Sequence, residues 1–286
     1  MILVLRIIVI FLLGLKAYSL FNATHSISYE KHGYSWEEYD PFLAKRLQSV
    51  TQILSYTDSL NSFKPRNNLQ YCELLENVFR KRFYHGYSNY TYANNWLAAI
   101  AGKLVWNDLS AIVIPDHILK HPMAACSQQS IVLMECFKKI GIDYRKVGFT
   151  GHYALEGRIN NKWFFFDPNR EPEFINKRKS VSDLLLRNEL ASSYDHFPDS
   201  SNAKLLSPTY GSVNEVLTPN AAFFHKSTYV LSNLFVAIGV IFTLFPFINK
   251  TVKKKRQMIV NNIKGAFSSL EVITKEEEKL VINNKV

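Results

Sequence analysis

Residues 125–167 read ACSQQSIVLMECFKKIGIDYRKVGFTGHYALEGRINNKWFFFD and place Cys126, His152 and Asp167 in that order. A nucleophilic thiol, an imidazole that takes its proton and a carboxylate that orients the imidazole are the parts of a cysteine acyl-transfer site. Order alone is weak evidence, because 3 Cys and 8 His in 286 residues invite chance pairings. The local structure expected around each residue therefore carries the argument.

The stretch 124–140 predicts one helix, since its apolar residues recur at spacings of three and four and Gly141 follows as a stop. Cys126 falls in the first turn, where free backbone N–H groups and the helix dipole favour an anion. Such a position lowers the pKa of a thiol and supplies donors for an oxyanion. Taken alone, a helical cysteine is more often a small buried apolar residue, which is what we expect of Cys136.

Three strands are predicted after this helix, because short segments rich in aromatic and β-branched residues are separated by turn residues: 144–149, 152–159 and 162–167. If Asn160-Asn161 forms the second turn, Asp167 lies opposite Ala154 and diagonal to His152 on one face. Diagonal neighbours are about 7–8 Å apart at the backbone, within reach of a carboxylate–imidazole hydrogen bond.

The same register places Asn169 directly opposite His152 and makes it the reserve orienting residue. A one-residue bulge would move Asp167 to the other face. Considered singly, His152 could be a structural strand histidine and Asp167 a turn residue before Pro168. The agreement of three separate placements favours a site.

At these residues the chain resembles the transglutaminase-like superfamily, whose members share a papain-like core. The resemblance rests on four short segments with the order helix, strand, strand, and it covers about a sixth of the chain: Cys126-Ser127-Gln128-Gln129-Ser130, Gly141-Ile142-Asp143-Tyr144-Arg145, Gly151-His152-Tyr153-Ala154-Leu155-Glu156 and Trp163-Phe164-Phe165-Phe166-Asp167-Pro168.

The resemblance implies that Cys126 is the nucleophile, His152 the general base and acid, and Asp167 the orienting carboxylate. Ala125 departs from the family pattern, in which a Gly often lies within a residue or two of the cysteine. A papain-like Gln ahead of the cysteine is absent, so Trp106 and Trp96 are the upstream candidates for an oxyanion or substrate contact. No cofactor and no metal site are expected.

The expected fold is α+β: a papain-like transglutaminase core in which the nucleophile helix packs on an antiparallel sheet. A helical N-terminal layer, predicted from 36–57, 68–85 and 93–104, packs on this core, and a transmembrane helix ends it. The expected divisions are a signal peptide or uncleaved signal anchor (1–21), a transglutaminase-like domain (22–191, catalytic core about 90–170), a loosely structured linker (192–227), a transmembrane helix (228–248) and a basic cytoplasmic tail (249–286).

The predicted transmembrane helix is Thr228–Ile248, 21 residues without a charge, which is enough to cross about 30 Å of hydrocarbon. Basic residues follow at once, and the positive-inside rule places that end in the cytoplasm. The protein is therefore expected in the plasma or inner membrane, as a single-pass or two-pass protein, with its catalytic domain outside the cytoplasm. A buried core helix is the competing interpretation of this segment.

The net charge of +10 does not indicate nucleic acid, because residues 250–286 hold nine basic and four acidic residues and so carry half of the excess. Next to a membrane such a cluster contacts anionic lipid. No zinc-finger spacing, phosphate loop or recognition motif accompanies it. The expected partners are a protein or peptide substrate and the membrane.

Two functions remain open from the sequence. The first is a membrane-tethered cysteine enzyme that forms a thioester and acts as a peptidase, amidase or acyltransferase. The second is a catalytically silent transglutaminase-like interaction module in a membrane or cell-envelope assembly. The tyrosine-rich stretch 84–92 could form the rim of a substrate cleft or pack down on the domain, and Cys72 and Cys136 could pair in an oxidising compartment.

Overall fold

The computed structural model describes residues 29–30, 34, 37–61, 65–174, 177–195 and 207–283, with scattered positions between 7 and 17. The chain forms two compact units: a larger one from Leu15 to Ser232, and a smaller one made of Met1–Gly14 and Asn233–Val286. The predicted signal segment, 1–21, lies mostly outside the described residues.

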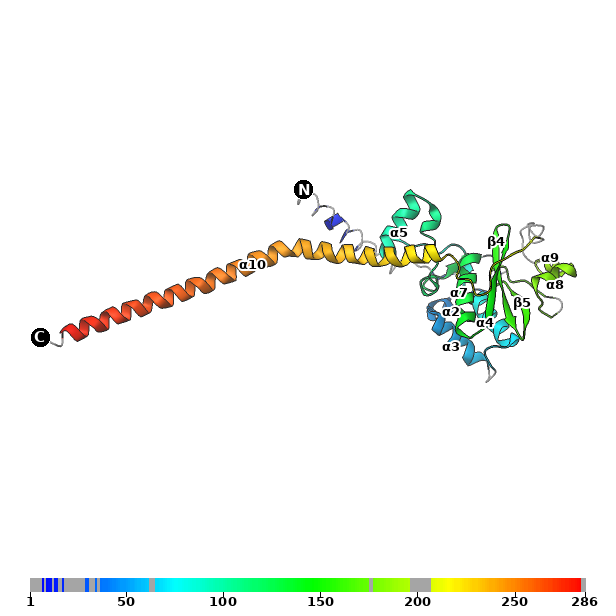
Figure 1. Ribbon diagram of the computed structural model, residues 1–286, viewed down its shortest axis with the longest axis horizontal. Helices are drawn as coiled ribbons and strands as arrows, with labels where there is room; N and C mark the ends of the chain where they lie inside the picture. Colours follow the sequence, from blue (N-terminus) through cyan, green and yellow to red (C-terminus); the bar gives the residue numbers. More distant parts are fainter. Residues whose placement is uncertain are drawn as a thin grey trace. The chain divides into compact units, whose positions relative to one another are not determined.

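The larger unit mixes helices and strands and continues into a long C-terminal helix (Figure 1). In chain order the elements are α2 (Pro41–Arg46), α3 (Val50–Leu60), α4 (Leu69–Arg82), β1 (Tyr84–His85), α5 (Tyr92–Leu104), η1 (Asn107–Leu109), α6 (Pro115–Ile118), β2 (Met123–Ala124), α7 (Cys126–Lys139), β3 (Asp143–Phe149), β4 (His152–Ile159), β5 (Lys162–Phe166), α8 (Val181–Leu186), α9 (Glu189–Ser192), β6 (Thr209–Tyr210) and α10 (Pro219–Asn283). Helix α10 begins in the larger unit and continues into the smaller one.

The main sheet is antiparallel and has the strand order β5-β4-β3-β6. Asn160 and Asn161 both adopt positive φ, 50° and 61°, as a two-residue hairpin turn of this kind requires. Ile159 pairs with Lys162, and the same register continues to Leu155 and Phe166. The predicted register of this hairpin is therefore confirmed.

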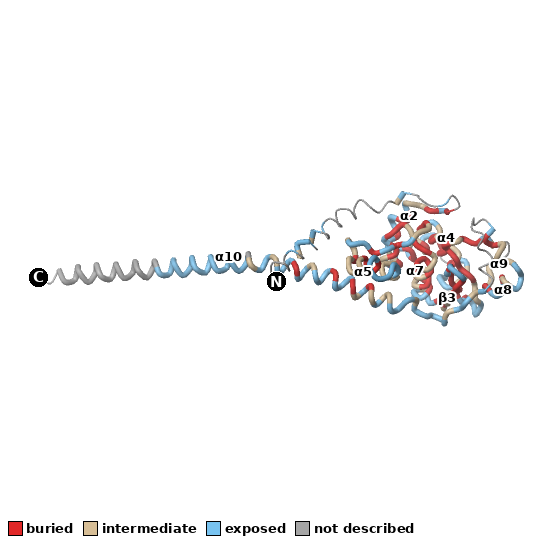
Figure 2. The backbone as a smooth tube through the Cα atoms, turned by 90° about the horizontal axis from the view of Figure 1, so that it is seen from above, coloured by how far each residue is buried: buried red, intermediate tan, exposed pale blue. Residues whose placement is uncertain are grey.

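Alternate residues of the strands face two different apolar clusters. Phe166 joins the main core with residues of α3, α4 and α7. Phe165, one residue earlier, packs with Val181, Leu184 and Tyr194 beside α8 and α9. The sheet is thus covered on both faces, and the buried backbone, red in Figure 2, is concentrated where these layers meet.

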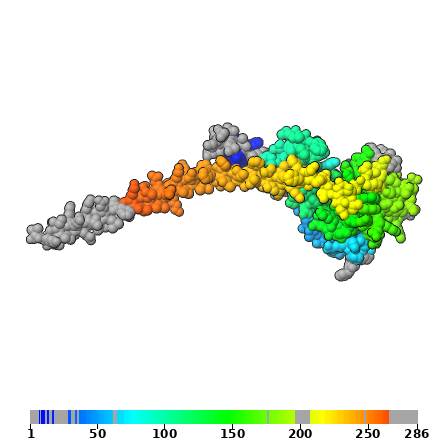
Figure 3. All heavy atoms as spheres, viewed as in Figure 1, coloured from blue at the N-terminus to red at the C-terminus, as the bar shows by residue number. Residues whose placement is uncertain are grey.

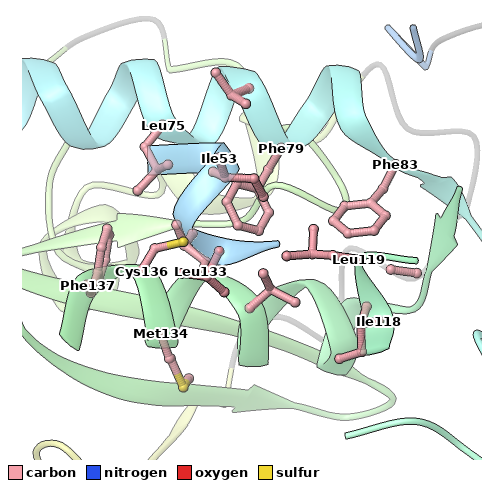
Figure 4. Packing of buried hydrophobic residues seen from close by; sticks show 14 of the residues in the cluster. Ile53, Leu75, Phe79, Phe83, Ile118, Leu119, Leu133, Met134, Cys136 and Phe137 are labelled. Atoms are coloured by element: carbon pink, nitrogen blue, oxygen red, sulfur yellow. The ribbon is translucent and has the colours of Figure 1, made fainter. Parts of the chain in front are cut away.

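The main core lies between α3, α4 and α7. Ile53, Leu75, Phe79, Leu133 and Phe137 are all fully buried in it, and Figure 4 shows how the side chains from these three helices meet. Helix α7, which carries Cys126 at its first position, is therefore held rigidly against its neighbours.

Gly157 allows α7 to approach the sheet closely. A Cβ atom built at this position of β4 would lie 2.8 Å from the ring of Phe137, closer than carbon atoms pack. Glycine at position 157 therefore lets α7, which carries Cys126, pack closely on β4, which carries His152.

The helical layer differs from the prediction at its start. The expected helix 36–57 is two helices, α2 and α3, because the chain breaks at Leu47 and restarts with Ser49 as N-cap, whose hydroxyl accepts the Gln52 N–H. The predicted linker, 192–227, contains β6 and the first turns of α10 among its described residues. In the described part of this segment β6 pairs with β3, a contact that periodicity alone does not reveal.

The smaller unit consists chiefly of α10 after residue 232. A stretch of 18 residues in this helix has a mean hydropathy of 2.2, so the helix is long and apolar enough to span a membrane. Only 12% of this stretch is buried inside the protein. Apolar side chains are exposed on all sides of it, Phe242 and Leu244 among them at 54% and 49%. The orange part of Figure 3 shows this stretch as a single rod of side chains.

Candidate active site

Cys126 opens α7 directly after the short strand β2. The first backbone bond of the helix runs from the Gln129 N–H to the Ala125 carbonyl, 2.9 Å away. The N–H groups of Cys126 to Gln128 precede it, and such groups at a helix start are the donors that favour an anion. The predicted placement of the thiol in the first helical turn is thus confirmed, with the helix beginning at Cys126 rather than at 124.

The buried amide of Gln128 holds this helix start in place. Its Oε1 accepts the N–H groups of Ala125 and Ser88 at 3.1 and 2.9 Å, and its Nε2 donates to the Ser88 and Ile112 carbonyls at 2.7 and 2.9 Å. The Gln128 side chain thus accepts two hydrogen bonds and donates two, and Gln128 is only 2% exposed. The loop before Cys126 is therefore fixed in position rather than free to move.

His152 begins β4 and is 2% exposed. Its Nε2 lies 2.6 Å from Oδ2 of Asp167, the first residue beyond β5. The ring of Phe149 stacks on the imidazole at 6.2 Å with an interplanar angle of 16°. With Nε2 bound to the carboxylate, the other ring nitrogen is left for the Cys126 thiol, whose pKa His152 lowers.

Asp167 is fully buried and accepts further hydrogen bonds. The Tyr194 hydroxyl donates to Oδ2 over 2.7 Å, while the backbone N–H groups of Asn169 and Arg170 donate to Oδ1 over 3.3 and 3.2 Å. A carboxylate with this many donors stays ionised despite its burial. Its ionised state is what orients His152.

The electrostatics of the three groups favour an ion pair. Burial raises the pKa of the Cys126 thiol, but the hydrogen bond and charge of His152 and an N–H from Tyr153 outweigh it, and the pKa is lowered overall. Burial opposes the imidazolium too, yet the charge and hydrogen bond of Asp167, with a smaller contribution from Cys126, raise the pKa of His152 to about 9. Burial likewise opposes ionisation of Asp167, but His152 and Tyr194 lower its pKa.

The other two cysteines have opposite properties. Cys72 and Cys136 are free thiols with no exposed surface. Burial raises the pKa of Cys72 to about 12 and raises that of Cys136 as well. Cys126 is therefore the one cysteine of the three whose pKa lies below that of an ordinary thiol.

A buried ion pair supports the strand end that carries Asp167. Glu76 of α4 accepts the Asp167 N–H through Oε1 at 2.8 Å and binds Nη2 of Arg178 through Oε2 at 2.5 Å. Arg178 also donates to the Phe165 carbonyl and lies over the Phe166 ring, 4.6 Å from its centroid. This pair joins α4 to β5 immediately beside the carboxylate.

Two exposed tyrosines lie at the thiol. Tyr153 is 41% exposed, and its backbone N–H helps to lower the pKa of Cys126. Burial and then the charge of Cys126 raise the pKa of Tyr87, which is 59% exposed. Within the tyrosine-rich stretch, Tyr84 and Tyr90 pack down, at 8% and 4% exposure, while Tyr87 and Tyr92 are exposed at 59% and 39%.

The remaining predicted site residues lie apart from the triad contacts. The Trp96 indole N–H donates to the Ser232 carbonyl on α10, and Trp106 is 63% exposed just before η1. Asn169 is buried and its Nδ2 faces the Ala124 carbonyl at 3.4 Å, since β5 ends before the residue can pair with His152. Tyr194, Gln128 and Glu76 were not predicted as site residues.

Within the described part of the chain, no group of three or more His, Cys, Asp or Glu side chains is placed to hold a metal ion. No protein-family model, no curated protein and no solved structure matches this chain.

Proposed function

We propose that this protein is a membrane-tethered cysteine enzyme of the transglutaminase-like type, with a papain-like core, that acts outside the cytoplasm on amide or peptide bonds. One observation carries the proposal: His152 is hydrogen-bonded to the buried carboxylate of Asp167 and lowers the pKa of Cys126, the first residue of a helix. The roles of nucleophile, general base and acid, and orienting carboxylate follow from this arrangement.

The first half of the reaction forms a thioester. The Cys126 thiolate attacks the carbonyl carbon, and the backbone N–H groups at the start of α7 stabilise the resulting oxyanion. The His152 imidazolium gives its proton to the leaving nitrogen as the C–N bond breaks, so an amine departs and a neutral imidazole remains.

The second half restores the enzyme. Neutral His152 takes a proton from the acceptor, which attacks the thioester carbonyl and expels the Cys126 thiolate. With water as acceptor the product is a carboxylic acid, and with an amine it is a new amide. Asp167 holds the imidazole in position and stabilises its charged form throughout.

The location outside the cytoplasm is part of the proposal. Lys250, Lys253, Lys254, Lys255 and Arg256 follow the apolar stretch of α10, and a cytoplasmic position for this cluster leaves the residues before the span on the other side. The basic tail would then lie against anionic lipid of the inner leaflet.

Alkylation of the full-length protein by iodoacetamide at pH 7, read by peptide mass spectrometry, tests the thiol chemistry. We expect Cys126 to react first and His152→Ala to slow that reaction. Burial alone protects Cys72 and Cys136, so slow reaction at those positions is uninformative and the His152→Ala comparison decides. Equal rates with and without His152 would contradict the enzyme proposal and favour the silent interaction module.

A further inference from the structure

Helix α5 is fastened to the beginning of α10 by buried polar side chains. The Trp96 indole N–H donates to the Ser232 carbonyl over 3.2 Å, and the Leu97 N–H donates to the Ser232 hydroxyl over 3.3 Å. Asn95, at a kink in α5, bonds Thr228 at 2.9 Å and the Ser232 hydroxyl at 3.2 Å. Thr228 and Ser232 are thus polar residues in an otherwise apolar stretch, and both are hydrogen-bonded to α5.

These contacts place α5 at the edge of the proposed span. The proposed span, residues 228–248, has 21 helical residues, which at roughly 1.5 Å each match a hydrocarbon thickness of about 30 Å. Ser232 is then about one helical turn inside the outer edge of the hydrocarbon. Because Trp96 contacts Ser232 directly, a bilayer spanned by these residues has its outer edge near the start of α5.

The other end of α5 carries three consecutive exposed apolar residues. Leu104, Val105 and Trp106 are 77%, 78% and 63% exposed. They form the tip of the hairpin made by α5 and η1. The returning arm, η1, also contacts α10, because His225 Nε2 lies 2.9 Å from the Leu109 carbonyl oxygen. Eight residues separate Trp96 from Leu104, so the tip is at most about 12 Å along the helix from the Ser232 contact.

The tip is itself ordered. The Trp106 N–H donates to the Ala101 carbonyl at 3.2 Å, and the Leu109 N–H donates to the Trp106 carbonyl at 3.0 Å. Gly102 lets the two arms meet, because a Cβ there would lie 2.5 Å from Cβ of Ser110. A fixed loop that presents Leu, Val and Trp and is attached to the first turns of α10 matches the composition of interfacial anchors.

We propose that Leu104, Val105 and Trp106 insert into the outer interface of the bilayer that α10 spans, as a second membrane contact of the domain. We assign lipid as the occupant of this patch because both arms of the hairpin are hydrogen-bonded to the first turns of α10, at Ser232 and at His225, where the proposed span begins. The inference rests on the proposed membrane span and not on the thiol chemistry. Its consequence is a domain held in one orientation on the membrane surface.

Site-specific labelling of the full chain in phosphatidylcholine vesicles tests this contact. In a Cys126→Ala background, whose two remaining thiols are buried, an environment-sensitive fluorophore is attached at Leu104→Cys, Leu186→Cys or Leu244→Cys. Leu186, on α8, is 84% exposed and serves as the matched control, while Leu244 lies in the apolar stretch of α10. Fluorescence is measured with and without nitroxide-labelled lipids, and with iodide in the water.

We expect lipid nitroxides to quench the labels at 104 and 244 at least twofold more than the label at 186, and iodide to quench 186 most. Lipid quenching at 244 but not at 104, with iodide reaching 104 as freely as 186, would overturn the second contact and leave the span intact. Absence of lipid quenching at 244 as well would overturn the span and this inference with it. Unchanged circular dichroism of each labelled variant shows that the fold is intact.

Discussion

Oδ2 of Asp167 lies 2.6 Å from Nε2 of His152, and the same carboxylate oxygen accepts the Tyr194 hydroxyl at 2.7 Å. The hairpin register brings the first two residues together, and a segment beyond α9 supplies the third. All three side chains are at most 2% exposed, so their charges interact through protein rather than water. The properties of Cys126 depend on this buried arrangement.

Removing the charge of Asp167 tests its effect on the thiol. Asp167→Asn should lower the pKa of His152 and so deprive the Cys126 thiolate of its partner, slowing iodoacetamide alkylation at pH 7 by roughly tenfold or more. Asp183→Asn, on the exposed start of α8, should leave the rate unchanged. An unaltered rate in Asp167→Asn would contradict the orienting role of the carboxylate.

Tyr194 acts as a positioning residue. Tyr194→Phe removes a hydrogen bond to a buried charge, so we expect the free energy of unfolding to fall by about 2 kcal/mol. The pKa of Asp167 should rise, because one of the donors that hold it down is lost, and the free energy of unfolding measured as the pH falls detects this shift. Tyr210→Phe is the matched control, since that half-exposed hydroxyl only meets Ser182 at 3.1 Å, and it should shift neither quantity.

The pH dependence of acyl transfer follows from two opposite shifts. The lowered pKa of Cys126 places the onset of activity below the ordinary range of a thiol, and loss of the His152 proton near pH 9 ends it. Hydrolysis of an activated ester should therefore give a bell-shaped kcat/KM profile with its alkaline limb near pH 9. A single rise near the ordinary pKa of a thiol would show that Cys126 and His152 do not act as a pair.

The Glu76–Arg178 pair is expected to support the fold around the site. Glu76→Gln leaves the buried Arg178 guanidinium without its main partner and should cost roughly 3 kcal/mol of unfolding free energy. Glu73→Gln is the control on the same helix, because Glu73 is 41% exposed and 3.4 Å from the same arginine, and it should change stability by less than about 1 kcal/mol. Denaturant midpoints at equal m-value measure both, and equal losses would refute a special role for Glu76.

The sequence predicts the local parts of this site because they obey short-range rules. The positions of Asn160 and Asn161 determine the hairpin register and so the meeting of His152 with Asp167. Gly141 and the apolar spacing determine the extent of α7, and thereby the place of Cys126.

The supporting residues depend on contacts between distant segments. Tyr194 lies in what reads as a polar linker, and its partner is 27 positions away. Glu76 resembles a surface residue of an amphipathic helix, yet it bonds Asp167, 91 positions away. Gln128 could be placed on α7 but not beside Ser88, 40 positions earlier. No periodicity within one segment contains this information.

The central claim is that Cys126 forms a covalent acyl intermediate with the help of His152. The most direct measurement treats the full-length protein with p-nitrophenyl acetate at pH 7 and examines its peptides by mass spectrometry. We expect an acetyl group on Cys126 that hydroxylamine removes, and we expect it to form much more slowly in His152→Ala than in the unmodified protein. Acetylation confined to surface lysines, or formed on Cys126 at the same rate without His152, would contradict it.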